Sequence, residues 1–346
     1  MTSRITRWIA AILVPVALLA ACSDESAPDE LVLMTHDSFA LSEGTLDAFT
    51  DQTGIAVILQ TAGDAGSMVN QAVLTKDNPI ADVIYGIDNT FLSRAVEEGV
   101  FVPHTAAGID AVVEGLRVEG DPVTPIDFGD VCVNYDIDAL DEAGVAPPTS
   151  IRDLTDPVYR GLVVVEDPAA SSPGLAFLLA TVATFGEDGD YPWTQYWEDL
   201  FANDVTVASD WSDAYLVEFT RAGGERPIVV SYASSPPAEV LFGELDAAPT
   251  AAVLDGCFRQ IEYAGVVAGR PHTEAAAKLV DFLLTVEVQE DIPLNMFVYP
   301  ANTEAQLPDV FATHTVFPPS PITVDPAAIQ ANRERWINEW VTIARS

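Results

Sequence analysis

The sequence has few basic residues. It contains 15 Lys and Arg against 53 Asp and Glu, which gives 346 residues a formal net charge of −38. Nucleic-acid phosphates would be repelled by such a chain, so we expect no nucleic-acid partner. The acidic residues are spread along the chain, which favours a highly solvated surface over one acidic site. The charge also fits a cationic ligand.

The sequence has only one long apolar run, and that run lies at its start. The run from Trp8 to Ala21 follows Arg4 and Arg7. It has the form of a signal peptide, because it is too short to span a bilayer comfortably. We therefore expect an exported protein whose mature chain is soluble apart from any anchor.

The end of this run resembles the lipobox of bacterial lipoproteins, with the sequence LAAC at Leu19 to Cys22. The resemblance implies that residues 1–21 are removed and that Cys22 carries lipid. Residues 22–30 would then be a lipidated N-terminus with a polar, acidic tether, which places the protein on the extracytoplasmic side of the cell membrane. The alternative is an ordinary signal peptide followed by a chance cysteine.

Cysteine is also scarce, with three in the chain. If Cys22 carries lipid, Cys132 and Cys257 remain as an even pair in an oxidising compartment, where disulfides form. Both lie in strand-like segments (VCVNY and CFRQIEY) that would be neighbouring hinge strands in a two-lobed binding protein. We predict a disulfide, with two buried free thiols as the alternative.

Motifs for catalysis or metal binding are absent from the sequence. The four histidines are far apart, and none has a metal-ligand neighbour at helical spacing; they are His36, His104, His272 and His314. There is no C-x-x-C, G-x-S-x-G, Walker A or G-x-G-x-x-G motif. Carboxylate pairs carry no information in so acidic a chain. We therefore predict no enzyme activity, no cofactor and no metal site.

Strand-like and helix-like segments alternate along the chain, which indicates an α/β fold. A β-α-β-α-β-α unit occupies residues 31–103, an extended run covers 124–135, and residues 258–267 cross back. A helix is expected over 213–221, and a final helix over 326–344 with Trp336 and Trp340 on one face. This order predicts a bilobal, periplasmic-binding-protein-like (type II) fold with crossover hinge strands and a ligand cleft between the lobes. We assign 31–125 and 262–302 to lobe 1, 126–261 to lobe 2 and 303–346 to a C-terminal segment with a terminal helix.

Aromatic, hydroxyl and acidic side chains gather at the ends of these elements. In open α/β sheets, ligands bind at the carboxyl ends of strands. Helix N-termini with hydroxyl caps favour anions, and Trp and Tyr rings favour flat or cationic groups. The segments concerned are HDSF at 36–39, Asp64, SSPG at 171–174, WS at 211–212 and YASSP at 232–236.

From about Leu31 to the C-terminal helix, the chain resembles the thiamine-binding periplasmic proteins of ABC transporters. The segments that carry the likeness are THDSFA (35–40), ADVIYGIDN (81–89), DFGDVCVNYD (127–136), EDPAASSPGL (166–175), DWSDAY (210–215), SYASSPPA (231–238) and VYPAN (298–302). The resemblance implies a monomer that binds thiamine, thiamine monophosphate or thiamine pyrophosphate and docks on a membrane permease.

The resemblance also implies roles for single residues. Trp211 and Tyr232 would contact the ligand rings. Ser171 and Ser172 would contact its phosphate or hydroxyethyl end. Asp64 would lie in a loop that contacts the ligand. The next position is Ala65, where the family usually has glycine. His36 stands where the family often has tyrosine, and Phe297 where it can have tryptophan. The remaining predicted contacts are Asp37, Ala233, Ser234 and Ser235.

Other readings remain open at this point. The same fold can bind iron, a polyamine or a sugar, although iron-binding relatives usually have adjacent tyrosines and here Tyr232 precedes Ala233. A thiamine-degrading enzyme would need a cysteine nucleophile in the cleft, whereas Cys132 and Cys257 lie in the crossover strands. A purely structural lipoprotein would not need the rings and hydroxyls at the strand ends.

Overall fold

The computed structural model describes residues 28–346. The predicted signal peptide and Cys22 lie outside these residues. Within them, no helix is both long enough and apolar enough to cross a membrane. We use the ranges predicted above as names for lobe 1 and lobe 2; the division itself stays a prediction.

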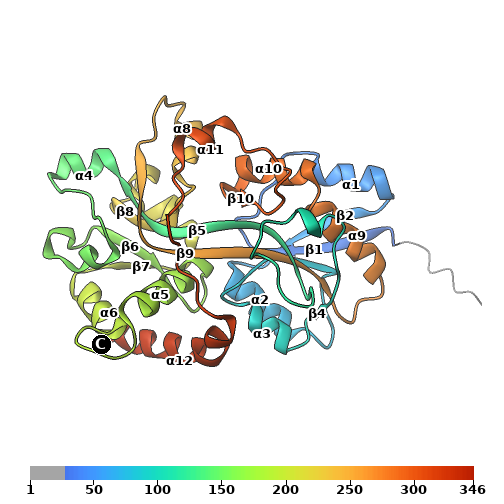
Figure 1. Ribbon diagram of the computed structural model, residues 1–346, viewed down its shortest axis with the longest axis horizontal. Coiled ribbons are helices and arrows are strands. Elements are labelled where there is room, and N and C mark those ends of the chain that lie inside the picture. Colours follow the sequence, from blue (N-terminus) through green and yellow to red (C-terminus); the bar gives the residue numbers. More distant parts are fainter. Residues whose placement is uncertain (1–27) are drawn as a thin grey trace, which may run out of the picture.

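Two long antiparallel strands connect the lobes. Strands β5 (Thr124–Asp136) and β9 (Thr250–Val267) pair along most of their length and run side by side across the middle of the molecule (Figure 1). They join one continuous sheet of order β2-β1-β3-β9-β5-β8-β6-β7. The two predicted crossings of the chain are therefore confirmed as neighbouring strands.

Lobe 1 is built on three parallel strands, β1 (Glu30–Thr35), β2 (Ala56–Thr61) and β3 (Val83–Asp88). All six residues of β3 are buried, which is typical of a central strand covered on both faces. The short β4 (Phe101–Val102) pairs with β9, and β10 (Tyr299–Pro300) pairs with β5. The helices are α1 (Thr45–Thr53), α2 (Ala65–Leu74), α3 (Leu92–Glu97), α9 (Thr273–Leu283) and α10 (Val286–Met296).

Lobe 2 is built on β6 (Val163–Glu166), β7 (Thr206–Ala208) and β8 (Ile228–Tyr232), with β6 parallel to both neighbours. Helix α5 is its central helix, because residues 172–182 of this helix are all buried. The helices are α4 (Ile137–Ala143), α5 (Ser172–Phe185), α6 (Trp193–Ala202), α7 (Trp211–Asp213) and α8 (Pro236–Gly243).

The C-terminal segment contains α11 (Asp309–His314) and α12 (Pro326–Ala344), and the bounds of α12 match the predicted ones. Helix α12 packs against α6 of lobe 2 and α3 of lobe 1 (Figure 1). The predicted shared face of Trp336 and Trp340 is buried. The Trp340 ring lies 5.5 Å from the Trp197 ring of α6.

Two local predictions were wrong. A single helix was expected over 213–221, but the chain forms α7, a π-helical turn (Ala214–Glu218) and a 3-10 turn (Thr220–Ala222), because it folds back so tightly that Gly224 lies against the Glu218 carbonyl. The return strand was expected from residue 258 but begins at Thr250. The turn-like Asp255-Gly256 pair is absorbed there as a β-bulge, with φ +80° at Gly256.

The bulge holds the disulfide between Cys132 on β5 and Cys257 on β9, so the predicted pairing is confirmed. The β5–β9 register shifts between Val131 and Val133, which leaves Cys132 without a ladder partner on β9 and directs it at the bulge. Both cysteines are buried. The disulfide therefore covalently links β5 and β9, the two strands that connect the lobes.

Candidate ligand-binding site

A cavity of about 370 Å³ lies between the lobes, where β1, β2, β6, β7 and β8 end. This is the edge at which ligands bind in open α/β sheets. The cavity contains nine of the predicted contact residues: His36, Asp37, Asp64, Ala65, Ser172, Trp211, Tyr232, Ser235 and Phe297. Their common location follows from the fold; their role in binding stays a prediction.

Three predicted contacts do not line the cavity. Ser171 is buried as the N-cap of α5, where its side chain accepts a hydrogen bond from the Gly174 backbone. Ala233 packs against the disulfide. Ser234 is fully buried, and its hydroxyl has no hydrogen-bond partner in the part of the chain that the structure describes. These three side chains face the protein interior instead of the cavity. Adjacent residues in a turn point in different directions, so only some of them can line the cavity.

The aromatic wall of the cavity comes mainly from lobe 2. The Trp211 ring stacks on Tyr215 with centroids 5.1 Å apart, and its Nε1 donates to Ser231 Oγ at 3.0 Å. Phe297, from lobe 1, meets Phe242 of α8 edge to face at 5.5 Å. Tyr215 and Phe242 were not among the predicted contacts. The rings are thus held in place before any ligand arrives.

Asp64 lies where helix N-termini from the two lobes meet. It is the N-cap of α2, and its Oδ1 accepts the backbone N–H of Ala65 at 2.6 Å and that of Ser172 at 3.1 Å. Burial raises the pKa of Asp64, although these hydrogen bonds oppose that shift. Ala65 does not have a positive φ, so replacing the family's usual glycine leaves the start of α2 helical.

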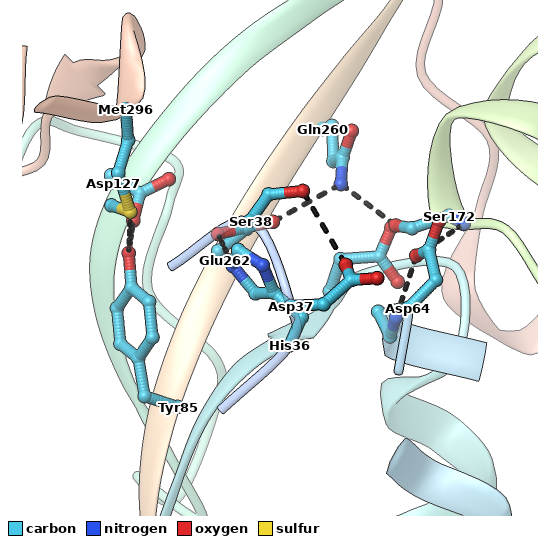
Figure 2. A network of polar contacts seen from close by, with 12 residues as sticks. His36, Asp37, Ser38, Asp64, Tyr85, Asp127, Ser172, Gln260, Glu262 and Met296 are labelled. Atoms are coloured by element: carbon cyan, nitrogen blue, oxygen red, sulfur yellow. Dashed lines mark hydrogen bonds and ion pairs between the residues drawn. The ribbon is translucent and has the colours of Figure 1, made fainter. Parts of the chain in front are cut away.

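A hydrogen-bonded chain extends from Ser172 into the crossover strands. The Ser172 hydroxyl donates to Asp88 at the end of β3 and accepts from Gln260 Nε2 at 2.7 Å. The Tyr232 hydroxyl donates to Gln260 Oε1 at 2.9 Å. Burial raises the pKa of Asp88 to about 6. The chain connects lobe 1, lobe 2 and β9, and Figure 2 shows its link between Gln260 and Ser172.

A second polar group on the floor contains two carboxyl groups (Figure 2). Glu262 of β9 lines the cavity, and its Oε2 lies 3.3 Å from His36 Nε2. Asp127 of β5 is fully buried and accepts a hydrogen bond from the Tyr85 hydroxyl. Burial and the neighbouring Glu262 charge raise the pKa of Asp127 well above its usual range. Burial therefore favours the protonated form of this carboxyl.

Sequence reasoning missed Gln260 and Glu262, although a signal was present. The return strand QIEY places polar residues at positions 260 and 262, two apart, so both side chains point to one face of β9. Gln260 is buried and Glu262 nearly so. Polar side chains spaced by two on a long strand indicate a polar cavity floor when they are buried. Their burial is known only from the structure.

The cavity is acidic. Its lining contains Asp37, Asp64, Glu239 and Glu262, and among the residues that the structure describes no Lys or Arg lines it. Residues 28–346 contain no group of three or more His, Cys, Asp and Glu that could hold a metal ion. Such a lining favours a ligand that carries positive charge.

The chain resembles solute-binding proteins in sequence and structure. The model of the family of bacterial extracellular solute-binding proteins matches residues 78–320. The thiamine-binding periplasmic protein of Escherichia coli (strain K12) is 31% identical over 327 residues, which cover 93% of this chain and 96% of that protein. The one from Salmonella typhimurium is 29% identical, with coverage of 94% and 96%.

Solved structures of periplasmic binding proteins are similar to this chain as well. A periplasmic thiamin binding protein superposes with a TM-score of 0.81 at 30% identity, covering 91% of this chain and 96% of that one. Iron-bound HitA from Pseudomonas aeruginosa has a TM-score of 0.72 at 21% identity, covering 92% and 99%, and shows the fold alone. The predicted bilobal binding-protein fold is thereby confirmed. The chain belongs to the bacterial extracellular solute-binding proteins, within the group of the thiamine-binding periplasmic proteins, and is an extracytoplasmic substrate-binding component of transport.

Proposed function

We propose that this protein captures thiamine or a thiamine phosphate in the cavity between its lobes and delivers it to an ABC permease. The observation that carries the proposal is a cavity with aromatic walls and four acidic side chains but no Lys or Arg among the described residues. The names of the similar proteins point to the same ligand class.

The chemistry of thiamine fits this lining. Its pyrimidine ring is flat and its thiazolium ring is cationic. The Trp211 and Tyr232 rings can contact these rings, and a cation over an aromatic face contributes about 0.5–2 kcal/mol. The carboxylates offset the thiazolium charge or accept hydrogen bonds from the aminopyrimidine. The hydroxyethyl or phosphate tail would lie toward Asp64 and Ser172, where the α2 and α5 N-termini meet.

The protein would release its ligand unchanged. A cysteine nucleophile is unavailable in the described residues, because Cys132 and Cys257 are bonded to each other. We further propose that the mature chain acts as a monomer held at the membrane by lipid on Cys22, with the residues between Cys22 and β1 as a tether; the predicted end of the tether at residue 30 is corrected, because Glu30 already pairs in the sheet. The lipobox-like sequence supports this anchoring.

Titration calorimetry tests the ligand directly. Purified protein is titrated with thiamine, thiamine monophosphate and thiamine pyrophosphate, and native mass spectrometry identifies any ligand carried through purification. We expect a one-to-one complex with at least one of the three, and recovered ligand of unchanged mass after long incubation. Absence of binding to all three would refute the proposal, and appearance of cleaved products would indicate an enzyme instead.

A further inference from the structure

The four acidic residues of the cavity differ in how fully they are already paired. Asp64 caps α2 and bonds to the Ser172 backbone. Glu239 accepts from the Tyr215 hydroxyl at 2.8 Å and lies 3.5 Å from Arg221. Asp37 lies exposed at the rim. Glu262 is deep in the cavity, with 12% of its side chain exposed, and its only cationic neighbour among the described residues is a histidine.

That histidine, His36, lies in an unusually acidic environment. Its ring packs against the Gly86 backbone and lies 5.9 Å from the Tyr85 ring on β3. Glu262 on β9 faces His36 directly. Two further carboxylates lie farther from the ring: Asp64 at the start of α2, and Asp37, which follows His36 in the sequence. Burial alone lowers the pKa of His36, but these three carboxylates reverse the shift and raise it.

Further groups surround Glu262 itself. Asp127 on β5, whose pKa is raised by burial, supplies no positive charge, and its Oδ1 has no hydrogen-bond partner within residues 28–346. Tyr232 on β8 is neutral, because burial followed by the Glu262 charge raises the pKa of its hydroxyl well above the usual range. Gln260 approaches Glu262 at 3.4 Å and is uncharged. Among the described residues, His36 is thus the group beside Glu262 that can carry a balancing positive charge.

We propose that Glu262 is the residue that selects a positively charged ligand, and that His36 is its counter-ion until the ligand replaces it, so that binding releases the His36 proton to solvent. The proposal rests on the proposed function, because thiamine supplies the cation. Two positive charges cannot share one buried carboxylate without mutual repulsion, and the imidazolium can lose its proton whereas the thiazolium cannot lose its charge.

Because ligand binding is coupled to loss of the His36 proton, the ligand affinity must depend on pH in one direction. A bound cation lowers the pKa of His36 relative to the empty protein, so the complex holds fewer protons than the free components. Affinity must then rise with pH from the pKa of His36 in the complex up to its pKa in the ligand-free protein, which lies above the ordinary imidazole value of 6.5. Affinity becomes independent of His36 once the empty protein has lost the proton.

Calorimetry with thiamine in two buffers of different ionisation heat measures the protons released. We expect wild-type protein to release up to about one proton at pH 6.5 and almost none near pH 9. His36→Gln should abolish the release at pH 6.5. His104→Gln is the matched control, because His104 also lies beside a carboxylate, Asp281 at 2.7 Å, but outside the cavity; this variant should release as many protons as wild type.

Glu262→Gln should weaken thiamine binding by about tenfold or more and remove the proton release, while thermal unfolding verifies the fold. Thiamine binding without proton release in wild type would overturn this inference and leave the proposed function intact. Release that persists in His36→Gln, or unchanged affinity in folded Glu262→Gln, would overturn it as well. Failure of the wild type to bind any thiamine compound would refute both. The wild-type measurement needs no variant, so it decides even where a variant fails to fold.

Discussion

The Asp64 carboxylate accepts the backbone N–H of Ser172 at 3.1 Å and so joins two helix N-termini from opposite lobes. The same oxygen accepts the Ala65 N–H, which begins α2. A single oxygen therefore caps one helix and connects it to the other beside the cavity. An opening of the predicted lobes would break the contact to Ser172, so we propose that Asp64 links ligand capture to lobe closure.

Asp64→Ala should reduce both stability and ligand affinity. Loss of an N-cap costs about 0.5–2 kcal/mol, and the lost interlobe bond weakens the closed form. Asp325→Ala is the matched control, because Asp325 caps α12 in the same way, accepting from Ala327 at 2.8 Å, but lies outside the cavity. Urea unfolding should show similar losses for both variants, whereas calorimetry should show weaker thiamine binding only for Asp64→Ala. Equal affinities would contradict the interlobe role.

Trp211→Ala should lose most of the thiamine affinity, by about tenfold to a hundredfold, because a stacked ring and a cation–π contact disappear together. The fold should survive, since Trp211 is only partly buried and its neighbour Tyr215 stays anchored to Glu239. Tyr191→Ala serves as the control, because it removes a partly buried ring outside the cavity. Wild-type affinity in folded Trp211→Ala would exclude a stacking role.

Removal of the Cys132–Cys257 disulfide should lower the free energy of unfolding by about 2–5 kcal/mol, because the bond closes a loop with a sequence separation of 125 residues. Chemical unfolding of a Cys132→Ala/Cys257→Ala double variant measures the loss. Thiol titration of the unfolded wild type, expressed from residue 23 without Cys22, should detect no free thiol before reduction and two after it. Two free thiols before reduction would contradict the bond.

The stability of the protein should depend on Asp88 between about pH 4 and pH 6. Its pKa is raised by burial from 3.8 to about 6, so the folded state binds more protons than the unfolded state in this range. The contribution of Asp88 is fully present below pH 3.8 and is lost as pH rises through 6. Asp88→Asn should therefore flatten the stability profile there, as measured by urea unfolding across pH.

Asp121→Asn provides the opposite case. Hydrogen bonds from Arg117 and Thr105 lower the pKa of Asp121 to about 2, so its contribution is present above pH 3.8 and is lost toward pH 2. This variant should leave the slope between pH 4 and pH 6 unchanged. Identical slopes for wild type and Asp88→Asn in that range would show that Asp88 is not the group responsible.

Cys22→Ser should release the exported protein from the membrane, because serine cannot carry the thioether-linked lipid that the lipobox-like sequence implies. Membrane fractionation and mass spectrometry of the N-terminal peptide measure the change. The wild-type peptide should carry the mass of a diacylglyceryl group on Cys22. An unmodified N-terminal peptide from membrane-associated wild type would rule out lipidation.

The sequence by itself determined the order of the elements, because hydrophobic periodicity and capping residues are local signals. The bounds of α12, the crossing by β5 and the Ser171 cap on α5 could be predicted in this way. The disulfide could be predicted by counting, since only Cys132 and Cys257 remained and both occurred in hinge-like segments. The residues at the strand ends also identified 10 of the 21 residues that line the cavity.

Only the tertiary structure decided which acidic side chains come together at the floor of the cavity. Among 53 Asp and Glu, the spacing of Gln260 and Glu262 becomes informative only once burial is known, and no local pattern distinguishes Asp127 from solvated carboxylates. They come together because β9 pairs with β5 in a register that places Asp127 opposite Glu262, while the loop after β1 brings His36 to the same floor. The bulge at residues 254–257 likewise appears only in the pairing of β9 with β5, where it carries the Cys257 that is bonded to Cys132. Burial and long-range register create these pairings, and neither is encoded within a short stretch of sequence.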